Sequence, residues 1–307
     1  MKAVITGATG AVGMALVSSL TQNGYEVLVL GRPNSERNAR LQNLDGVTLE
    51  YCDLSELSLF ESRERYDVFF HLGWGGTTGA ARNDMYLQNK NIEYTLDAVN
   101  LAHRLGCSTF VGAGSQAEYG RAHGKLSADT KTEPENGYGI AKLTAGRMSR
   151  ILCRELGMKH VWARILSVYG EYDGENSMVM STIGKIIEKK IPEFTPAEQV
   201  WDYMYSGDAA DALVAIAERG RDGAVYPLGG GEPTPLCEYI KMIRDAVDKN
   251  AELGIGRLPY AENQVMYLCA DISALTSDTG FVPKYSFKEG ISKTVEWVRS
   301  ERLITTK

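Results

Sequence analysis

The sequence predicts an α/β protein with a doubly wound parallel sheet and a smaller C-terminal lobe. Short apolar runs of strand type alternate with helical stretches through the first half of the chain, which is typical of a parallel sheet covered by helices on both faces. A glycine-rich turn joins the first of these runs to the first helical stretch. The chain has 307 residues, which is enough to bury a substantial core and more than one domain usually holds.

The first predicted strand and helix enclose the glycine-rich turn, residues 6–13. The strand is predicted over 2–6 and the helix over 12–20, where apolar residues recur at helical spacing. At such a turn one glycine permits the tight bend, the next lets the backbone approach a pyrophosphate, and the third lets the helix pack on the strand: Gly7, Gly10 and Gly13. The helix N-terminus attracts the anion. The turn therefore predicts a dinucleotide site; the alternative is a glycine-rich turn without a ligand.

The remaining elements of the sheet follow in order. A long helix is predicted over roughly 84–105, and another begins near Tyr138. The strands predicted after the first are 27–30, 47–51, 68–72, 109–111 and 161–165.

The pattern changes after Gly170, where Gly, Pro and polar clusters separate shorter elements. Such punctuation is expected of a lobe that closes over a substrate. We expect a dinucleotide-binding domain over residues 1–167, to which 201–228 returns, and a substrate-binding lobe over 168–200 and 229–307.

A tyrosine, a lysine and a serine form the candidate catalytic group. Tyr138 and Lys142 are four residues apart, so they share one face of a helix. An ammonium near the phenol is expected to lower the pKa of the tyrosine below about 10, so that the phenol exchanges a proton with a sugar or alcohol oxygen while hydride moves to or from nicotinamide. The same spacing also occurs on solvated helix faces, but Ser115 ends a predicted strand at the sheet edge where ligands bind.

With these motifs the chain resembles the extended short-chain dehydrogenase/reductase family, in particular its branch acting on nucleotide sugars. The resemblance covers nearly the whole length. It rests on ordered matches at Thr6 to Gly13, Cys52-Asp53-Leu54, His71-Leu72-Gly73, Asn91-Ile92 with Thr95, Gly114 to Gly120, Tyr138 with Lys142, Arg164 to Gly170, and Trp201 to Tyr205.

The resemblance implies a Rossmann domain with Ser115, Tyr138 and Lys142 as catalytic residues. The cofactor-binding residues it implies, besides Arg32, are Gly7, Thr9, Gly10, Ala11, Val12, Gly13, Asp53, Leu54, Leu72, Gly73, Trp74, Asn91, Ala113, Tyr138, Lys142 and Ile165. Candidate substrate contacts are Arg82, Gln116, Ser167, Tyr169 and Trp201, together with Trp74 and Glu118. The resemblance also implies a homodimer formed by the two long helices; the alternative is that these helices only pack on the sheet.

The choice of cofactor depends on the end of the second strand. An acidic residue there would bind the ribose 2′-hydroxyl of NAD, but this chain has Gly31 and Arg32, with Arg37 and Arg40 following. Guanidinium groups suit a 2′-phosphate, so NADP is favoured over NAD, unless Arg32 only stacks on the adenine. Asp53 matches the family position that binds the adenine amine, or it caps the helix near Ser55.

Two departures from the family pattern concern the substrate. Ser167 stands where the family commonly has an asparagine near the sugar diphosphate, and Trp201 replaces the arginine that usually precedes Asp-Tyr. Both weaken the transfer of the usual diphosphate contacts. Trp201 stacks on the base or sugar, or it is a core tryptophan.

The absence of other acid and base groups narrows the reaction. Gln116 and Ala117 occupy the place of the acidic pair of the 4,6-dehydratases, so dehydration is disfavoured, and Cys107 lies before its strand, away from the place that C3 or C5 epimerisation requires. This leaves an NAD(P)-dependent 4-keto-6-deoxy-hexose reductase, or a 4-epimerase with tightly bound NAD. Residues 169–178 look somewhat like those of reductases that make CDP-linked dideoxyhexoses. A non-catalytic dinucleotide-binding module is the remote alternative.

Composition bounds the partners and the compartment. A net charge of -6 and a pI near 5.4 argue against nucleic acid as a partner. The 5 cysteines are scattered without a Cys-x-x-Cys pair, so no metal site is expected and reduced thiols in a cytoplasm are. No apolar run reaches the roughly 18 residues that span a bilayer. We expect a cytoplasmic enzyme that acts on a nucleotide-diphosphate sugar and has no membrane partner.

Overall fold

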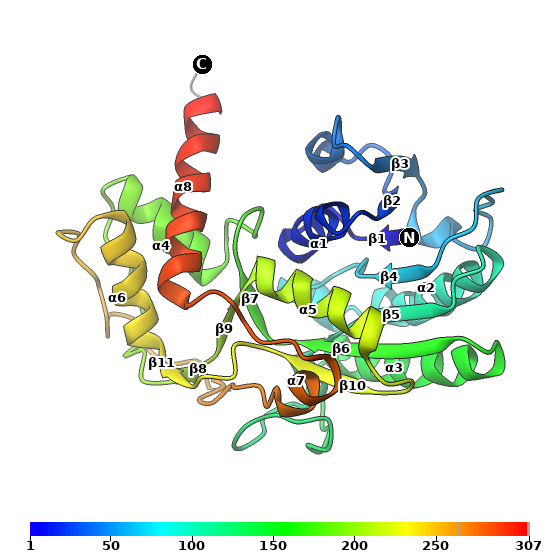
Figure 1. The fold of residues 1–307 in the computed structure, drawn as a ribbon. Helices are drawn as coiled ribbons and strands as arrows, with labels where there is room; N and C mark the ends of the chain where they lie inside the picture. The colour runs from blue at the N-terminus through cyan, green and yellow to red at the C-terminus, as the bar shows by residue number, and fades with distance from the viewer. Residues whose placement is uncertain (263, 306–307) are drawn as a thin grey trace.

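A seven-stranded parallel sheet forms the centre of the molecule (Figure 1). The computed structural model describes residues 1–262 and 264–305. The strand order is β10-β6-β5-β4-β1-β2-β3, and all pairs between neighbours are parallel. This confirms the predicted doubly wound sheet. The strands are β1 (Lys2–Thr6), β2 (Glu26–Gly31), β3 (Val47–Tyr51), β4 (Val68–His71), β5 (Thr109–Ser115), β6 (Lys159–Ile165) and β10 (Val225–Leu228).

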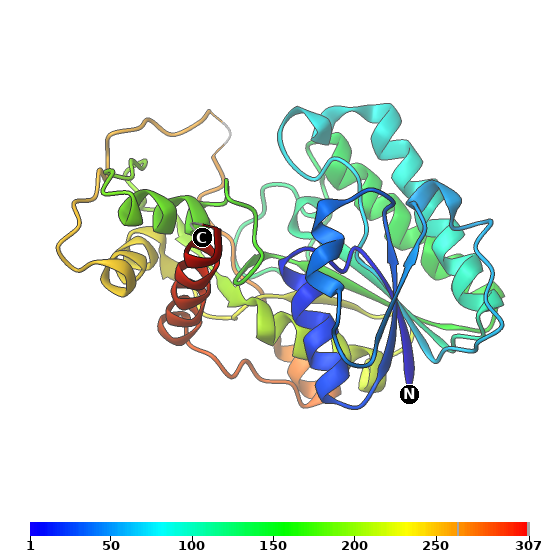
Figure 2. The same cartoon turned by 90° about the horizontal axis from the view of Figure 1, so that it is seen from above.

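Helices cover both faces of this sheet. In Figure 2 the blue helix α1 (Ala11–Gln22) lies on one side, and α2 (Met85–Arg104) and α3 (Gly137–Glu155) lie on the other. Helix α5 (Ser206–Arg219) packs beside α1, and both share a hydrophobic cluster with β1 and β2. The predicted long helix and the helix predicted near Tyr138 are thus confirmed as α2 and α3.

Side-chain caps set the beginnings of α2 and α3. The Asp84 carboxylate accepts a hydrogen bond from the Leu87 N–H at 3.1 Å, and the Asn136 side-chain oxygen accepts one from the Gly139 N–H at 2.8 Å. These bonds satisfy donors that the first turn of a helix leaves free. The cap at Asn136 therefore fixes the start of α3 and, with it, the position of Tyr138 in the first turn. Four short 3₁₀ helices complete this part: η1 (Glu36–Leu41), η2 (Leu54–Glu56), η3 (Gly79–Asn83) and η4 (Gln116–Glu118).

A row of stacked rings lies between the sheet and helix α3. From Phe69 through Phe110 and His160 to Trp162, the interplanar angles between successive rings are 17°, 14° and 10°. A Cβ atom built on Gly112 would lie 2.2 Å from the Trp162 ring, and one on Gly146 would lie 2.6 Å from it. The two glycines therefore make room for the largest ring. The rings, which extend over β4, β5 and β6, belong to Phe69, Phe110, His160 and Trp162.

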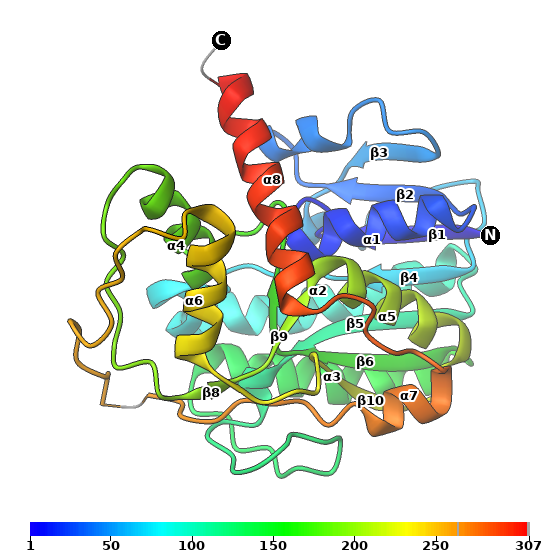
Figure 3. The same cartoon turned by 60° about the vertical axis from the view of Figure 1, so that its left-hand side comes forward.

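A second, mostly helical lobe stands beside the carboxyl ends of the strands (Figure 3). Helices α4 (Met178–Ile187), α6 (Leu236–Val247) and α8 (Phe287–Thr305) share one hydrophobic cluster. Two small sheets connect the lobe to the main domain. They pair β7 (Ser167–Tyr169) with β9 (Tyr203–Tyr205), and β8 (Val200–Trp201) with β11 (Thr234–Pro235).

The chain crosses between the two parts several times. After β9 it returns to the main domain as α5 and β10, and β10 pairs with β6. Helix α7 (Ser273–Thr279) also packs on α5, and Leu275 lies in the core of the main domain. Asp202 is fully buried between these crossings. Its carboxylate accepts hydrogen bonds from the N–H groups of Gly230, Gly231 and Ala270, which ties three distant segments together.

Candidate active site

The glycine-rich turn has the geometry of an open phosphate cradle. Gly7 has a φ of 75°, and a Cβ there would lie 2.6 Å from the Gly73 nitrogen. A Cβ on Gly13 would lie 2.4 Å from the Gly7 oxygen, so helix and turn meet closely. Gly10 caps α1 without a side-chain hydrogen bond, and a Cβ on it would meet no atom within 4 Å. The helix N-terminus, which attracts anions, is therefore open on this side.

A cavity of about 410 Å³ adjoins this turn at the carboxyl ends of the strands. Open α/β sheets bind ligands at this edge. The predicted cofactor residues that line it are Gly7, Thr9, Arg32, Asp53, Leu54, Gly73, Trp74 and Asn91. The others do not line it: Gly10, Ala11, Val12, Gly13, Leu72, Ala113, Tyr138, Lys142 and Ile165.

Gly31 stands at the end of β2, and the ends of two side chains approach it closely. A Cβ on Gly31 would lie 2.7 Å from the Leu49 side chain and 3.1 Å from the Asn38 side-chain oxygen. The Arg32 side chain is exposed and lines the cavity. The sequence analysis missed Asn38, whose side-chain oxygen is buried without a hydrogen-bond partner among the described residues. A single asparagine in the short 3₁₀ helix η1 gave no sequence pattern by which to find it.

Arg40 holds the turn rather than lining the cavity. Its guanidinium donates to the Thr9 carbonyl oxygen at 2.6 Å and lies 5.0 Å from the ring centre of Tyr172. Asp53 caps η2, because its carboxylate accepts from the Ser55 N–H at 3.1 Å. The capping alternative for Asp53 is thus what the structure shows, while its contact with adenine stays a prediction.

Ser115, Tyr138 and Lys142 come together at the end of β5. The Ser115 side chain is close enough to the Tyr138 hydroxyl to lower its pKa, and the Ser115 hydroxyl oxygen accepts from the Ala117 N–H at 3.2 Å. The Lys142 ammonium donates to the Ala113 carbonyl oxygen at 2.6 Å. All three side chains are buried.

Burial dominates the electrostatics of this group. It raises the pKa of Tyr138 above its usual value of 10, against the lowering effects of the Ser115 hydrogen bond and the Arg82 charge. The expectation that a neighbouring ammonium lowers this pKa is therefore wrong for this structure: desolvation of the phenolate outweighs it. Burial also lowers the pKa of Lys142 to about 7, against the raising effect of Glu118.

Trp74 and Arg82 contact the Tyr138 ring. The Lys142 nitrogen lies 3.7 Å from a ring centre of Trp74, and the Trp74 ring meets the Tyr138 ring edge to face at 6.1 Å. The Arg82 guanidinium lies 4.5 Å from the Tyr138 ring centre. Gln88, which the sequence analysis missed, accepts from the Trp74 indole N–H at 2.9 Å.

The loop that carries Trp74 is fixed from helix α2. The Gln88 side-chain amide donates to the carbonyl oxygens of Gly76 and Ala81, both at 2.9 Å. Asn91 is buried and exchanges two hydrogen bonds of 2.9 Å with the backbone of Gly75. In this structure Asn91 therefore shapes the loop.

Two of the predicted substrate contacts are buried away from a ligand. Tyr169 is 1% exposed, and its hydroxyl donates to the Phe287 carbonyl oxygen at 3.1 Å. Glu118 is 1% exposed and accepts from the Ser115 N–H at 2.8 Å. The expectation that these two face a hexose is corrected, because β7 directs Tyr169 into the core of the lobe and η4 turns Glu118 beneath Ser115. Gln116 and Arg82 are only partly buried.

The two positions that depart from the family pattern contact each other. The Trp201 indole N–H donates to the Ser167 hydroxyl oxygen at 2.7 Å. Trp201 is half-buried against a small cluster that includes Leu166 and Leu268. One edge of Trp201 thus packs in a core, as one alternative predicted, while part of its surface remains open.

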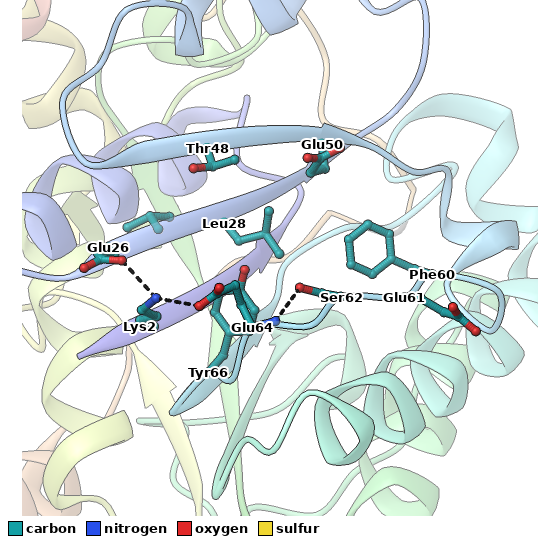
Figure 4. A pocket seen from close by; sticks show the side chains of 11 residues that line it. Lys2, Glu26, Leu28, Thr48, Glu50, Phe60, Glu61, Ser62, Glu64 and Tyr66 are labelled. Carbon is teal, nitrogen blue, oxygen red and sulfur yellow. Dashed lines mark hydrogen bonds and ion pairs between the residues drawn. The ribbon is translucent and has the colours of Figure 1, made fainter.

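A different cavity, of about 440 Å³, lies at the opposite edge of the sheet (Figure 4). There the Lys2 ammonium lies 3.2 Å from a Glu26 oxygen and 3.0 Å from a Glu64 oxygen. Because ligands of open α/β sheets bind at the carboxyl ends of the strands, we do not assign the site here. Within residues 1–262 and 264–305, no group of three His, Cys, Asp or Glu side chains could hold a metal ion. No helix in the same ranges is long and apolar enough to cross a membrane.

Comparisons with known proteins place this geometry in a family. A sequence profile of the NAD dependent epimerase/dehydratase family matches residues 3–229. An uncharacterized UDP-glucose epimerase of Bacillus subtilis is 24% identical over 98% of both chains.

Solved structures share the fold. The UDP-N-acetylglucosamine 4-epimerase of Methanobrevibacter ruminantium superposes with a TM-score of 0.88 at 21% identity, covering 98% of both chains. The UDP-glucuronic acid 4-epimerase of Bacillus cereus, in complex with UDP-glucuronic acid and NAD, superposes with a TM-score of 0.84 at 22% identity, covering 98% of this chain and all of the other. The chain belongs to the NAD dependent epimerase/dehydratase family, within the nucleotide-sugar branch of the extended short-chain dehydrogenases/reductases.

Proposed function

We propose that this enzyme performs oxidation or reduction at C4 of the hexose of a nucleotide-diphosphate sugar, with Ser115, Tyr138 and Lys142 as its catalytic residues. The observation that carries this proposal is that the buried side chains of Ser115, Tyr138 and Lys142 come together at the carboxyl end of β5. Two hydroxyls held in this way can both contact one substrate oxygen, and one of them carries a proton that can be transferred.

The residues at the glycine-rich turn fit a nicotinamide dinucleotide. The open side of Gly10 accommodates a pyrophosphate, and the adjoining cavity of about 410 Å³ accommodates the adenosine. The bound cofactor supplies or accepts the hydride. We favour NADP, because glycine at position 31 leaves no acidic side chain at the end of β2, and the exposed Arg32 lines the cavity, where it can meet a 2′-phosphate. The Bacillus cereus structure holds NAD, so this preference needs its own test.

Reduction of a 4-keto-6-deoxy-hexose is the reaction we favour. Burial raises the pKa of Tyr138, so the phenol stays protonated near neutral pH and is ready to donate. In the reduction, C4 of the sugar gains a hydride and its carbonyl oxygen gains the Tyr138 proton, which converts the ketone to an alcohol. The Ser115 hydroxyl holds the same oxygen. The Lys142 ammonium lies next to the phenol and stabilises the phenolate that remains.

A 4-epimerase is the second candidate. It would use the same three residues to remove and return hydride at C4 on opposite faces of the ring, and it would keep its NAD bound. The fold similarity to 4-epimerases of UDP-sugars favours it. Dehydration is disfavoured, because Gln116 and the buried Ala117 offer no carboxylate at the place of the acidic pair.

We further propose a homodimer formed through α2 and α3. Helix α3 exposes Ile140, Met148 and Ile151, which are 51%, 42% and 48% exposed and lie on one face of the helix. Tyr86, at the start of α2, is 87% exposed. Light scattering during size-exclusion chromatography should give twice the chain mass, and Ile151→Glu should shift it toward one chain. A monomeric parent protein would contradict this proposal.

The function is tested with purified protein and a panel of UDP-, dTDP- and CDP-linked hexoses and their 4-keto-6-deoxy derivatives. A reductase consumes NADPH in step with the loss of the ketone, whereas an epimerase contains NAD that survives gel filtration. Tyr138→Phe removes the proton donor and should lower turnover on the order of 10²-fold while cofactor binding survives. Turnover close to that of the parent enzyme would refute the catalytic role of Tyr138.

A further inference from the structure

The catalytic lysine has the face of an aromatic ring as a direct neighbour. The Lys142 side chain is buried, and its ammonium lies over the Trp74 indole, 3.7 Å from a ring centre. The ammonium also donates to the Ala113 carbonyl oxygen at 2.6 Å. Because an ammonium has three N–H donors, one carbonyl oxygen satisfies only part of it. The ring face of Trp74 therefore supplies a second contact to a cation that is buried from water.

This contact with the ring is direct, whereas the charge of Glu118 reaches Lys142 from an ion pair of its own. The Glu118 carboxylate is paired with the Arg164 guanidinium at 2.7 Å. Attraction between a cation and the face of an aromatic ring grows when water is excluded, and tryptophan offers the strongest ring face among the side chains. The buried contact with Trp74 is therefore stronger than the same contact at an exposed site.

The Trp74 ring is fixed through its indole N–H. This N–H donates to the Gln88 side-chain oxygen at 2.9 Å, and Gln88 is 2% exposed. The Gln88 amide nitrogen donates to the carbonyl oxygens of Gly76 and Ala81, so the amide cannot turn over without directing its own oxygen at two acceptors. Hydrogen bonds thus hold the edge of the indole and leave its face for the ammonium.

The indole also determines where the ammonium lies relative to the phenol. The Trp74 ring meets the Tyr138 ring edge to face at 6.1 Å, and the Lys142 nitrogen lies 5.9 Å from the Tyr138 ring centre. Trp74 lines the cavity of about 410 Å³ beside the glycine-rich turn as well. One side chain thus borders both the catalytic group and the cavity.

The other titratable and charged groups around Lys142 come from four elements. Burial lowers the pKa of Lys142 to about 7, and the charge of Glu118, from η4, acts in the opposite direction. His71, from β4, is neutral near pH 7, because burial lowers its pKa to about 3. Tyr138, from α3, is neutral because burial raises its pKa, and the Arg82 guanidinium, from η3, lies 4.5 Å from the Tyr138 ring centre. The charged groups of this set are thus Glu118 and Arg82, and the test below alters neither.

We propose that Trp74 is a positioning residue of the active site: the face of its indole ring holds the Lys142 side chain beside Tyr138 in the ammonium form. This inference rests on the proposed function only in giving Lys142 a catalytic role. Trp74 acts through Lys142, because its own N–H is taken up by Gln88.

Fluorination of the indole tests the ring face without changing its shape. Fluorine withdraws charge from the face and weakens its attraction for a cation. The protein is produced with tryptophan or with its mono-, di- or trifluorinated analogues and with ¹⁵N-labelled lysine, and the Lys142 side chain is titrated by NMR, its signal being assigned by its loss in Lys142→Met. The titration should move to lower pH with each added fluorine, by about one pH unit in total. In the reduction assay, the alkaline limb of kcat/KM should move with it.

Trp74→Phe, produced with the same fluorinated analogues, is the matched control. All the other tryptophans are fluorinated in it, but residue 74 is not, so its Lys142 titration should be the same with every analogue. A second readout comes from ¹⁹F NMR of the fluorinated parent protein. The signal of residue 74, assigned by its loss in Trp74→Phe, should titrate with the midpoint of Lys142 and should stop titrating in Lys142→Met.

The outcomes separate this proposal from the proposed function. A Lys142 titration that is equal with all analogues would overturn the role of Trp74, and so would a stepwise shift that persists in Trp74→Phe. A ¹⁹F signal of residue 74 that ignores the titration of Lys142 would overturn it too. A parent enzyme that turns over none of the sugars would instead refute the proposed function, and the two NMR titrations would still decide the role of Trp74.

Discussion

Arg32 offers a direct test of which dinucleotide the enzyme prefers. Its guanidinium is exposed at the rim of the cavity, where it would meet a 2′-phosphate, and Gly31 beside it carries no acidic side chain. A hydrogen bond between charged groups contributes about 1.5 to 3 kcal/mol. Because Arg32 is exposed, solvent screens the contact and we take the lower end of this range. Arg32→Ala should therefore weaken NADPH binding about tenfold.

The assay is a fluorescence titration of NADPH and NADH against the parent enzyme and the variant. NADH offers only a hydroxyl at the 2′ position, so its affinity should hardly change. Arg63→Ala is the control and should leave both affinities unchanged, since Arg63 is also exposed but does not line this cavity. An equal loss for both cofactors in Arg32→Ala would show that Arg32 is a platform for adenine, and both the preference for NADP and part of the case for a reductase would fall.

Two further predictions concern stability and are measured by urea unfolding. The pKa of Lys142 is lowered from 10.5 to about 7 in the folded protein, so the unfolded state binds more protons between these pH values and the free energy of unfolding rises with pH. Between pH 7 and pH 9 the parent protein should therefore gain about 2 kcal/mol of stability relative to Lys142→Met. A difference in stability that stays constant over this range would contradict the lowered pKa. Asp202→Ala leaves three backbone N–H groups without their acceptor and should cost at least about 3 kcal/mol. By contrast, Asp271→Ala, which removes an exposed acceptor of the Ser273 N–H, should cost about 1 kcal/mol or less. Similar losses in the two aspartate variants would show that Asp202 does not hold the crossing segments together.

The fold was predictable because its signals are local. Each strand of the main sheet from β1 to β6 is a short apolar run, and α1, α2 and α3 carry apolar residues at helical spacing. The beginnings of α2 and α3 follow from single capping residues, Asp84 and Asn136, that any sequence reader can see. The predicted cofactor residues Gly7, Thr9 and Gly73, which line the cavity, were likewise predictable from short local motifs.

The details of the site were not predictable because they depend on packing between distant segments. A lysine four residues away suggested a lowered pKa for Tyr138, but burial raises this pKa, and that burial depends on distant segments such as the loop of Trp74. Tyr169 and Glu118 lie in motifs that match the family, yet the motifs do not say which side of the backbone faces the ligand. Both side chains are buried by elements that meet only in the folded protein.

Two of the tryptophans lie where their intrinsic fluorescence can report on the state of the protein. Trp162 is sealed within the ring stack beside His160 and reports on the integrity of the sheet, so its emission should be blue-shifted until the protein unfolds. Trp74 is half-buried against the ammonium of Lys142 and lines the cavity beside the glycine-rich turn. A dihydronicotinamide bound nearby absorbs where tryptophan emits, so energy transfer from Trp74 would record cofactor arrival in real time. Energy transfer would thus report cofactor binding and the emission shift would report unfolding, both in one sample and without an added dye.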